Sequence, residues 1–99
     1  MLTSKQRAAL RGMANRLQPV FQIGKGGVDK ELITATDKCL AARELIKLRG
    51  LETSPHTARE AADMLAAATG ADVVQVIGYT VVLFRRKPKE SQFDEVFRR

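Results

Sequence analysis

Residues 20–33 read VFQIGKGGVDKELI: a short apolar run, a glycine-rich turn with one lysine, and the start of an amphipathic helix. The glycines let the backbone turn sharply and approach a ligand closely, because no Cβ stands in the way. A helix that begins just after them presents unpaired N–H groups and the positive end of its dipole, which favour a bound phosphate. The stretch therefore predicts a strand–loop–helix unit that grips a phosphodiester backbone through Gly24, Lys25, Gly26 and Gly27, with the backbone amides of residues 26–28 as donors.

The length of 99 residues allows one hydrophobic core and is too short for two. The apolar fraction of 44% is ordinary for a globular protein. No apolar run is long enough to cross a bilayer, and the first residues lack the basic-then-apolar order of a signal peptide. The single cysteine, Cys39, excludes a disulfide framework. We therefore expect a cytoplasmic domain in a reducing environment, without a membrane partner.

The chain is strongly basic, with 17 Lys and Arg against 11 Asp and Glu, a net charge of +6 and an isoelectric point near 10.0. Charge of this size is informative about partners rather than about fold. It favours a polyanion, with nucleic acid first and an anionic membrane surface second. The plain alternative is a solvated basic surface without a specific partner.

Hydrophobic periodicity and turn residues predict the order α-β-α-β-α-β-β. Helices are expected at residues 3–17, 29–43 and 55–69, and strands at residues 20–23, 44–49, 72–77 and 80–86. Thr3 or Ser4 caps the first helix, while the third has Ser54 as N-cap, Pro55 as first residue and Gly70 after its last turn. Gly78 and Tyr79 suit a type II′ hairpin. The polar stretch 90–99, which contains two phenylalanines, is expected as a short helix or a frayed end.

These elements predict an α/β fold with one four-stranded mixed sheet, in which strands joined through helices pair in parallel and the last hairpin adds an antiparallel edge. One face is expected under the second and third helices, and it carries Phe21, Ile23, Ile46, Leu48, Val74 and Val76. The first helix is expected to cover part of the other face, which carries Val20, Leu45, Lys47, Arg49, Val73, Gln75 and Ile77. The third helix turns a stripe of small residues to the sheet: Ala58, Ala61, Ala62, Leu65 and Ala68.

Six short segments, which include the glycine loop, follow one another in a specific order: LTSKQR at residues 2–7, PV at 19–20, IGKGGV at 23–28, ELIK at 44–47, VQVIG at 74–78 and LFR at 83–85. With these segments the chain resembles the YhbY-like CRM domain (chloroplast RNA splicing and ribosome maturation) in its bacterial single-domain form. The resemblance covers residues 2–86. Two departures are Arg43, where the family usually has histidine, and Phe84, where it usually has tyrosine.

The resemblance implies an RNA-binding protein that associates with the precursor of the large ribosomal subunit and aids its assembly. The fold would be similar to the C-terminal domain of translation initiation factor three, and the loop would act as the Gly-x-x-Gly loop of KH domains does on nucleotide backbone. Residues 1–88 would form the single RNA-binding domain, and 89–99 a polar tail. The partner would be large-subunit ribosomal RNA in a pre-ribosomal particle, bound by a monomer without cofactor.

Several basic side chains outside the loop are candidates to extend the grip on RNA, and binding should then weaken steeply with salt. They are Lys5, Arg7, Arg11, Lys30, Lys47 and Arg85. Asp29 and Glu31, in the first turn of the second helix, suit the helix dipole but repel a phosphate. If they point outward, they limit affinity without abolishing the site.

No residue pattern indicates catalysis or a metal. His56 is the one histidine and is expected at the surface, and Cys39 has no metal-ligand spacing around it. The serines lack a nucleophile-elbow context, and the glycine loop lacks the ending of a nucleoside-triphosphate site. Tyr79 is the one ring expected to be available for stacking on a base. Two alternatives to RNA binding stay open: a non-specific DNA-binding protein, and a protein-interaction module whose basic surface docks an acidic partner.

Overall fold

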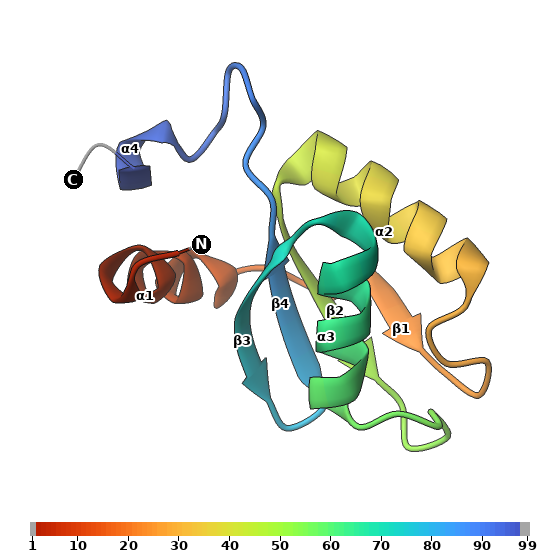
Figure 1. The fold of residues 1–99 in the computed structure, drawn as a ribbon. Coiled ribbons are helices and arrows are strands. Elements are labelled where there is room, and N and C mark those ends of the chain that lie inside the picture. The colour runs from red at the N-terminus through yellow and green to blue at the C-terminus, as the bar shows by residue number, and fades with distance from the viewer. Residues whose placement is uncertain (1, 98–99) are drawn as a thin grey trace.

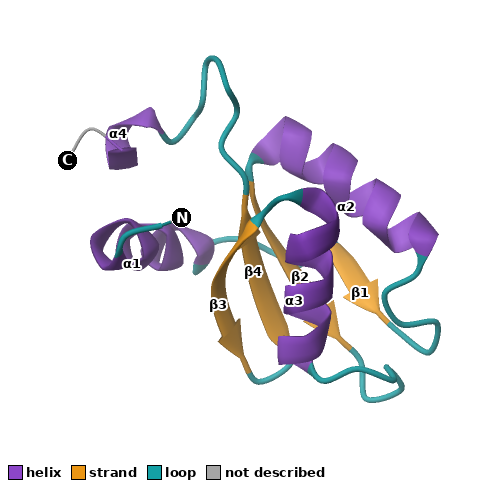
Figure 2. Cartoon of the chain, in the orientation of Figure 1, coloured by secondary structure: helices purple, strands orange, loops and turns teal. Residues whose placement is uncertain are grey.

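A four-stranded mixed sheet separates two groups of helices in the computed structural model, which describes residues 2–97 (Figure 1). The elements are α1 (Ser4–Ala14), β1 (Phe21–Ile23), α2 (Lys30–Arg43), β2 (Leu45–Gly50), α3 (Ala58–Thr69), β3 (Asp72–Ile77), β4 (Thr80–Phe84) and α4 (Asp94–Phe97). Helices α2 and α3 cover one face of the sheet, called here the front face, and α1 and α4 lie on the other, the back face (Figure 2). The predicted order of elements is confirmed, with α4 as a short additional helix.

The strand order is β1-β2-β4-β3, which differs from the prediction. Strands β1 and β2 pair in parallel as expected, with Phe21 opposite Leu48. Strand β4, expected at an edge, lies between β2 and β3 and is antiparallel to both, so β3 is the edge strand. The physical reason is visible in β4 itself, where four consecutive residues, Val81 to Phe84, are all buried. A strand with helices on both faces has no solvent-facing side, and it therefore occupies the centre of the sheet.

A β-bulge in β3 corrects the predicted faces of this strand. Val73 lies opposite Leu83 and Gln75 opposite Val82, so Val74 is the extra residue between them. Val74 consequently packs in the core of the back face, and Val73 packs against the core of the front face, the reverse of the prediction. Beyond the bulge the alternation resumes, and Val76 packs against the front-face core as expected.

Helices α1 and α3, which lie on opposite faces of the sheet, both begin with a capping box. Thr3 caps α1, and its hydroxyl accepts from the Gln6 amide at 3.1 Å while the Gln6 side chain accepts from the Thr3 amide at 3.0 Å. In α3 the cap is Thr57, paired in the same way with Glu60, so the prediction of Ser54 as cap and Pro55 as first residue is wrong. The Ser54 hydroxyl instead accepts from the His56 amide at 3.2 Å in the preceding turn.

At their C-terminal ends, α1 differs from the prediction and α3 agrees with it. Helix α1 ends at Ala14, three residues before the predicted Leu17. At the end of α3, Gly70 adopts a left-handed conformation with φ +75°, as a C-terminal glycine should. Ala68, predicted on the stripe of α3 that faces the sheet, is exposed, and Thr69 is buried in its place. The Thr69 hydroxyl donates to the Leu65 carbonyl at 2.7 Å.

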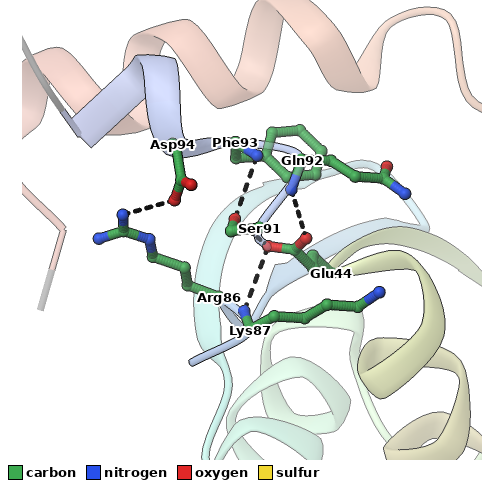
Figure 3. Close-up of polar contacts among 7 residues, drawn as sticks. All are labelled: Glu44, Arg86, Lys87, Ser91, Gln92, Phe93 and Asp94. Carbon is green, nitrogen blue, oxygen red and sulfur yellow. Dashed lines mark hydrogen bonds and ion pairs between the residues drawn. The ribbon is translucent and has the colours of Figure 1, made fainter. Parts of the chain in front are cut away.

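Glu44 joins α2 to β2 and was predicted as the first strand residue. It is instead the C-terminal cap of α2, is fully buried and has φ +67° and ψ −53°, a conformation that costs a non-glycine residue roughly 1–3 kcal/mol. Its carboxylate accepts from the amides of Gln92 at 2.8 Å and Lys87 at 3.2 Å and from the Ser91 hydroxyl (Figure 3). Glu44 thus fastens the segment after β4 to the rest of the fold.

The fastened segment, residues 91–97, closes part of the back face. The rings of Phe93 and Phe97 lie 5.4 and 5.7 Å from that of Phe84, the first edge-on and the second stacked. Arg86 forms an ion pair with Asp94 at 2.6 Å and lies over the Phe97 ring at 4.5 Å. Of the predicted polar tail, residues 98 and 99 lie outside the described part of the chain.

Candidate nucleic-acid interface

The glycine loop between β1 and α2 is a tight turn that is supported from one side and open on the other. The Gly27 amide donates to the Gly24 carbonyl at 2.9 Å, which closes the turn. Gly27 is buried with φ +66°, and a Cβ on it would lie 2.6 Å from Nε2 of His56 and 2.8 Å from Cγ of Pro55. Only glycine fits there, because both the backbone conformation and the space exclude a side chain. Lys25 and Gly26 are exposed on the open side of the turn.

The N-terminus of α2 is already occupied by a carboxylate. Asp29 is the N-cap, and its Oδ1 accepts from the Leu32 amide at 2.8 Å. Its second oxygen, Oδ2, is turned to the loop, since a Cβ on Gly26 would lie 3.4 Å from it. Asp29 therefore does not point away from the predicted phosphate site. With the Gly27 amide used in the turn and this charge at the helix end, the exposed backbone of Lys25 and Gly26 is the part of the loop that an anion can approach.

The other predicted basic residues lie on three separate parts of the molecule. Lys30, on the first turn of α2, is exposed beside the loop. Lys5, Arg7 and Arg11 are exposed on α1, which packs against α4, β2 and β3 on the far side of the molecule from the loop (Figure 1). Lys47 is half-buried in the middle of β2. The fold thus brings only Lys30 to the glycine loop.

Arg85 is used inside the fold. Its guanidinium donates to Oδ1 of Asp37 at 2.6 Å, to the Asp37 carbonyl at 2.9 Å and to the Thr69 carbonyl at 2.7 Å. It therefore ties the middle of α2 to the end of α3, and its side chain is 25% exposed. An RNA phosphate at Arg85 would have to compete with these three bonds.

Two features of this surface were not found from the sequence. His56, expected as an unrelated surface residue, lies half-buried against Gly27 and supports the loop. Arg43 and Lys47 line a back-face cavity with Gln92 and Phe93, which come from a distant part of the chain. No local pattern reports either contact, because each joins segments that are far apart in the sequence.

The remaining candidates are placed as follows. Tyr79 is 52% exposed at the β3–β4 hairpin. Cys39 is half-buried on α2, where burial raises the pKa of its thiol and the nearby Arg43 charge lowers it by less. Within residues 2–97, no three His, Cys, Asp or Glu side chains gather in a group that could hold a metal ion. The helices of this same region are all too short or too polar to cross a membrane.

A family model, curated relatives and a solved structure each match most of the chain. Residues 2–85 match the model of the CRS1 / YhbY (CRM) domain. The chain is 38% identical over 94 residues to "Probable RNA-binding protein YqeI" of Bacillus subtilis, covering 95% of this chain and 98% of that protein. It is 31% identical to an "RNA-binding protein" of Haemophilus influenzae, covering 85% of each chain. The solution structure of hypothetical protein SAV1595 from Staphylococcus aureus is similar with a TM-score of 0.79 and 40% identity, over 93% of this chain and 96% of that one.

Proposed function

The chain belongs to the CRS1 / YhbY (CRM) domain family, and we propose that it is an RNA-binding protein that grips RNA backbone at the loop of residues 24–27. Relatives that align along nearly the whole chain are named RNA-binding proteins, and the net charge of +6 suits a polyanionic partner. The observation that carries the proposal is the loop itself, whose glycines form a fixed turn with Lys25 and Gly26 exposed at its tip.

At this loop, the Lys25 ammonium and the exposed backbone at Gly26 hold one phosphate. Lys30 holds the adjoining phosphate from the first turn of α2. The Asp29 carboxylate beside Gly26 repels a phosphate that comes too close to the helix end, so it restricts where the strand lies and keeps affinity moderate. Each phosphate neutralised by a lysine releases counterions, and affinity falls as salt rises.

The exposed cations of α1, Lys5, Arg7 and Arg11, lie too far round the molecule to share a phosphate with Lys25 (Figure 1). We assign them to a second stretch of the same RNA and to long-range attraction, which raises the rate of encounter. This division suits a folded RNA that offers two strands, rather than one short single strand.

The RNA partner in this proposal is large-subunit ribosomal RNA, bound in a pre-ribosomal particle in the cytoplasm, and the protein aids assembly without catalysing a reaction. That context rests on the resemblance of residues 2–86 to bacterial single-domain members of the family. Sucrose-gradient sedimentation of lysates tests it: the protein should travel with particles that sediment near the large subunit and leave them after ribonuclease treatment. A protein that stays with a partner after ribonuclease treatment would instead be an interaction module.

The loop is tested by charge reversal at its exposed tip. Lys25→Glu and, separately, Gly26→Asp should each weaken binding to a folded ribosomal RNA fragment roughly tenfold at fixed salt, because they place a negative charge where a phosphate lies. Gly27 is left intact, since its positive φ makes any substitution a folding variant. The control is Lys89→Glu, an identical charge change at an exposed position after β4.

Binding is read by fluorescence anisotropy, and folding by circular dichroism. Unchanged RNA affinity in the folded Lys25→Glu and Gly26→Asp proteins would refute the role of the loop. A DNA duplex of matched length and sequence, used as competitor at the same salt, should compete far less well than unlabelled RNA. Equal competition would make the protein a general nucleic-acid binder.

A further inference from the structure

A cavity of about 440 Å³ opens on the back face, between the end of α1, the segment that enters β1, the start of β2 and the segment fastened by Glu44. Its apolar walls include Met13, Leu17, Val20, Leu45 and Phe93. Met13 is 42% exposed, so the cavity is open to solvent beside α1. The volume is in the range of about 300–1,000 Å³ that is usual for pockets that bind small ligands.

The polar groups around this cavity are cations and amides. Arg43 is exposed and Lys47 half-buried at its edge, and the exposed side chains of Gln18 and Gln92 add hydrogen-bond donors and acceptors. None of the carboxylates of residues 2–97 belongs to the lining. The cavity therefore combines an apolar interior with a polar, positive edge, which suits a flat aromatic ring that has polar edges and is attached to an anion.

One wall of the cavity is held in place by Glu44. Glu44 stands in the sequence between Arg43 and Leu45, and both of these residues line the cavity. Its carboxylate accepts from the Gln92 amide and from the Ser91 hydroxyl, and the Ser91 hydroxyl accepts from the Phe93 amide at 3.1 Å (Figure 3). These bonds fix Gln92 and Phe93 at the cavity, so the pocket is part of the folded protein and not a gap beside a loose tail.

The edge strand β1 runs from the cavity toward the glycine loop. The Val20 amide donates to the Lys47 carbonyl at 2.8 Å, which places the start of this strand at the cavity. A second hollow, lined by residues 19–22 and Arg49, follows on the same edge and shares Pro19 and Val20 with the first. From Val20 to Gly24 the chain extends about 13 Å at about 3.3 Å per residue, a span of a few nucleotides. Arg49, opposite Gln22 in the sheet, lies between the two ends.

We propose that this cavity receives one unpaired base of the RNA whose backbone the loop holds, with Arg43 and Lys47 on the phosphates that flank it. The proposal rests on the proposed RNA binding and adds a structural preference to it: the protein selects RNA with an unpaired or bulged nucleotide a few positions from the backbone contact at Lys25. Unpaired bases are recognised by stacking on rings and apolar side chains and by hydrogen bonds to their edges, and Phe93 and the two glutamines supply these groups here.

The test compares two hairpin RNAs that differ only in a single bulged uridine in the stem. The wild-type protein should bind the bulged hairpin roughly tenfold more tightly, as expected for one stacked base. With 4-thiouridine at the bulge, irradiation should give a crosslink that mass spectrometry maps to the lining, at Met13 or Phe93. Equal affinity for the two hairpins, or a crosslink that maps elsewhere, would overturn the proposal.

Two exposed methionines provide a matched pair of variants. Met13→Glu puts a carboxylate at the open side of the cavity, and Met64→Glu makes the same change on α3, where Met64 is 40% exposed. Met13→Glu should abolish the preference for the bulge and change affinity for the fully paired hairpin by less than about twofold, while Met64→Glu should leave both affinities unchanged. Circular dichroism and thermal melting confirm that both variants fold.

Lys25→Glu separates the base pocket from the backbone site. It should weaken binding of both hairpins by the same factor and leave the preference for the bulge intact. If Lys25→Glu has this effect but Met13→Glu weakens both hairpins equally, the cavity does not bind a base, and backbone binding stands. If the wild-type protein binds neither hairpin, the proposed function fails and the pocket proposal with it. A Met13→Glu effect on self-association in sedimentation, with RNA affinities unchanged, would make the cavity an interface between copies of this chain.

Discussion

The two faces of the sheet are closed in different ways. On the front face, α2 and α3 press Leu40, Ala61 and Leu65 onto the strands, and all three side chains are at most 2% exposed. On the back face, α1 and the segment after β4 cover only part of the sheet, and the rings of Phe93 and Phe97 in that segment pack on Phe84 of β4. The uncovered part carries Lys47, Arg49 and the open cavity. The front face is therefore built for stability, while the back face keeps apolar and cationic groups available to a ligand.

Truncation of the front-face core should have the largest effect on stability. Leu48 is fully buried there, and Leu48→Ala should lower the free energy of unfolding by about 2–5 kcal/mol, because it removes apolar contacts and leaves a cavity. Phe97→Ala, at a half-buried ring on the back face, should cost about 1–2 kcal/mol. Urea denaturation measures both. An equal cost for the two variants would show that the faces do not differ in this way.

Loss of the Glu44 carboxylate should release the back-face cover without unfolding the front. Glu44→Ala leaves the amides of Lys87 and Gln92 without their acceptor, at a cost of about 1–3 kcal/mol. Hydrogen exchange should quicken in residues 91–97 and stay slow in α3. The control is Asp94→Ala in the same segment, which removes only an exposed ion pair with Arg86 and should cost less than about 1 kcal/mol. Unchanged exchange in Glu44→Ala would contradict the anchoring role.

The same substitution at two glycines should act with opposite signs. Gly27→Ala should destabilise the protein by about 1–2 kcal/mol, because alanine is strained at φ +66° and its Cβ meets His56 and Pro55. Gly12→Ala, in the last turn of α1 with nothing within 4 Å of the new Cβ, should stabilise it by about 0.5 kcal/mol. Thermal melting distinguishes the two. A stabilising Gly27→Ala would show that the loop does not need the left-handed conformation.

The smallest effect concerns the thiol on α2. Burial raises the pKa of Cys39, so the folded protein keeps the thiol protonated at a pH where the unfolded chain has begun to ionise. At neutral pH the thiol is protonated in both states and does not affect the free energy of unfolding. As pH rises past the ordinary thiol pKa, the unfolded chain ionises more readily than the folded protein, and the free energy of unfolding falls. Alkylation by iodoacetamide between pH 7 and 9 should accordingly be slower than for a short cysteine peptide, a difference that disappears in urea. Reaction at the peptide rate in the native protein would contradict it.

Local sequence patterns predicted the helices and strands. The strand order and the face that each strand residue occupies depend on contacts between distant residues, and the patterns did not predict them fully. The type of each helix and strand follows from hydrophobic periodicity and from the positions of glycine and proline. The turn at residues 24–27 is formed by neighbouring residues, and its glycines predicted it. The position of β4 depends on how the whole sheet is covered, and one extra residue at Val74 exchanged two side chains between faces. The cap at Thr57 was missed because Ser54 and Pro55 form an equally typical start, and the sequence gives no sign that they lie in the turn before it.

The candidate site likewise has a part that neighbouring residues form and a part that depends on contacts between distant segments. Lys25 and Lys30 lie beside the glycines in the sequence and in the fold. The support of Gly27 by His56, the use of Arg85 within the fold and the back-face cavity each require segments more than 15 residues apart to meet. Apolar residues at 93, 96 and 97 in the polar tail, spaced as on one side of a helix, were the one local sign that this segment packs on the domain.

The most direct test of the account is a titration of the isotope-labelled protein with a ribosomal RNA hairpin, followed through its backbone amide resonances. We expect the largest shifts at Lys25 and Gly26, and we expect them to saturate with the binding curve and to shrink as salt is raised. Large shifts on α1 alone, with residues 24–27 unmoved at saturation, would contradict it and show that the protein holds RNA elsewhere.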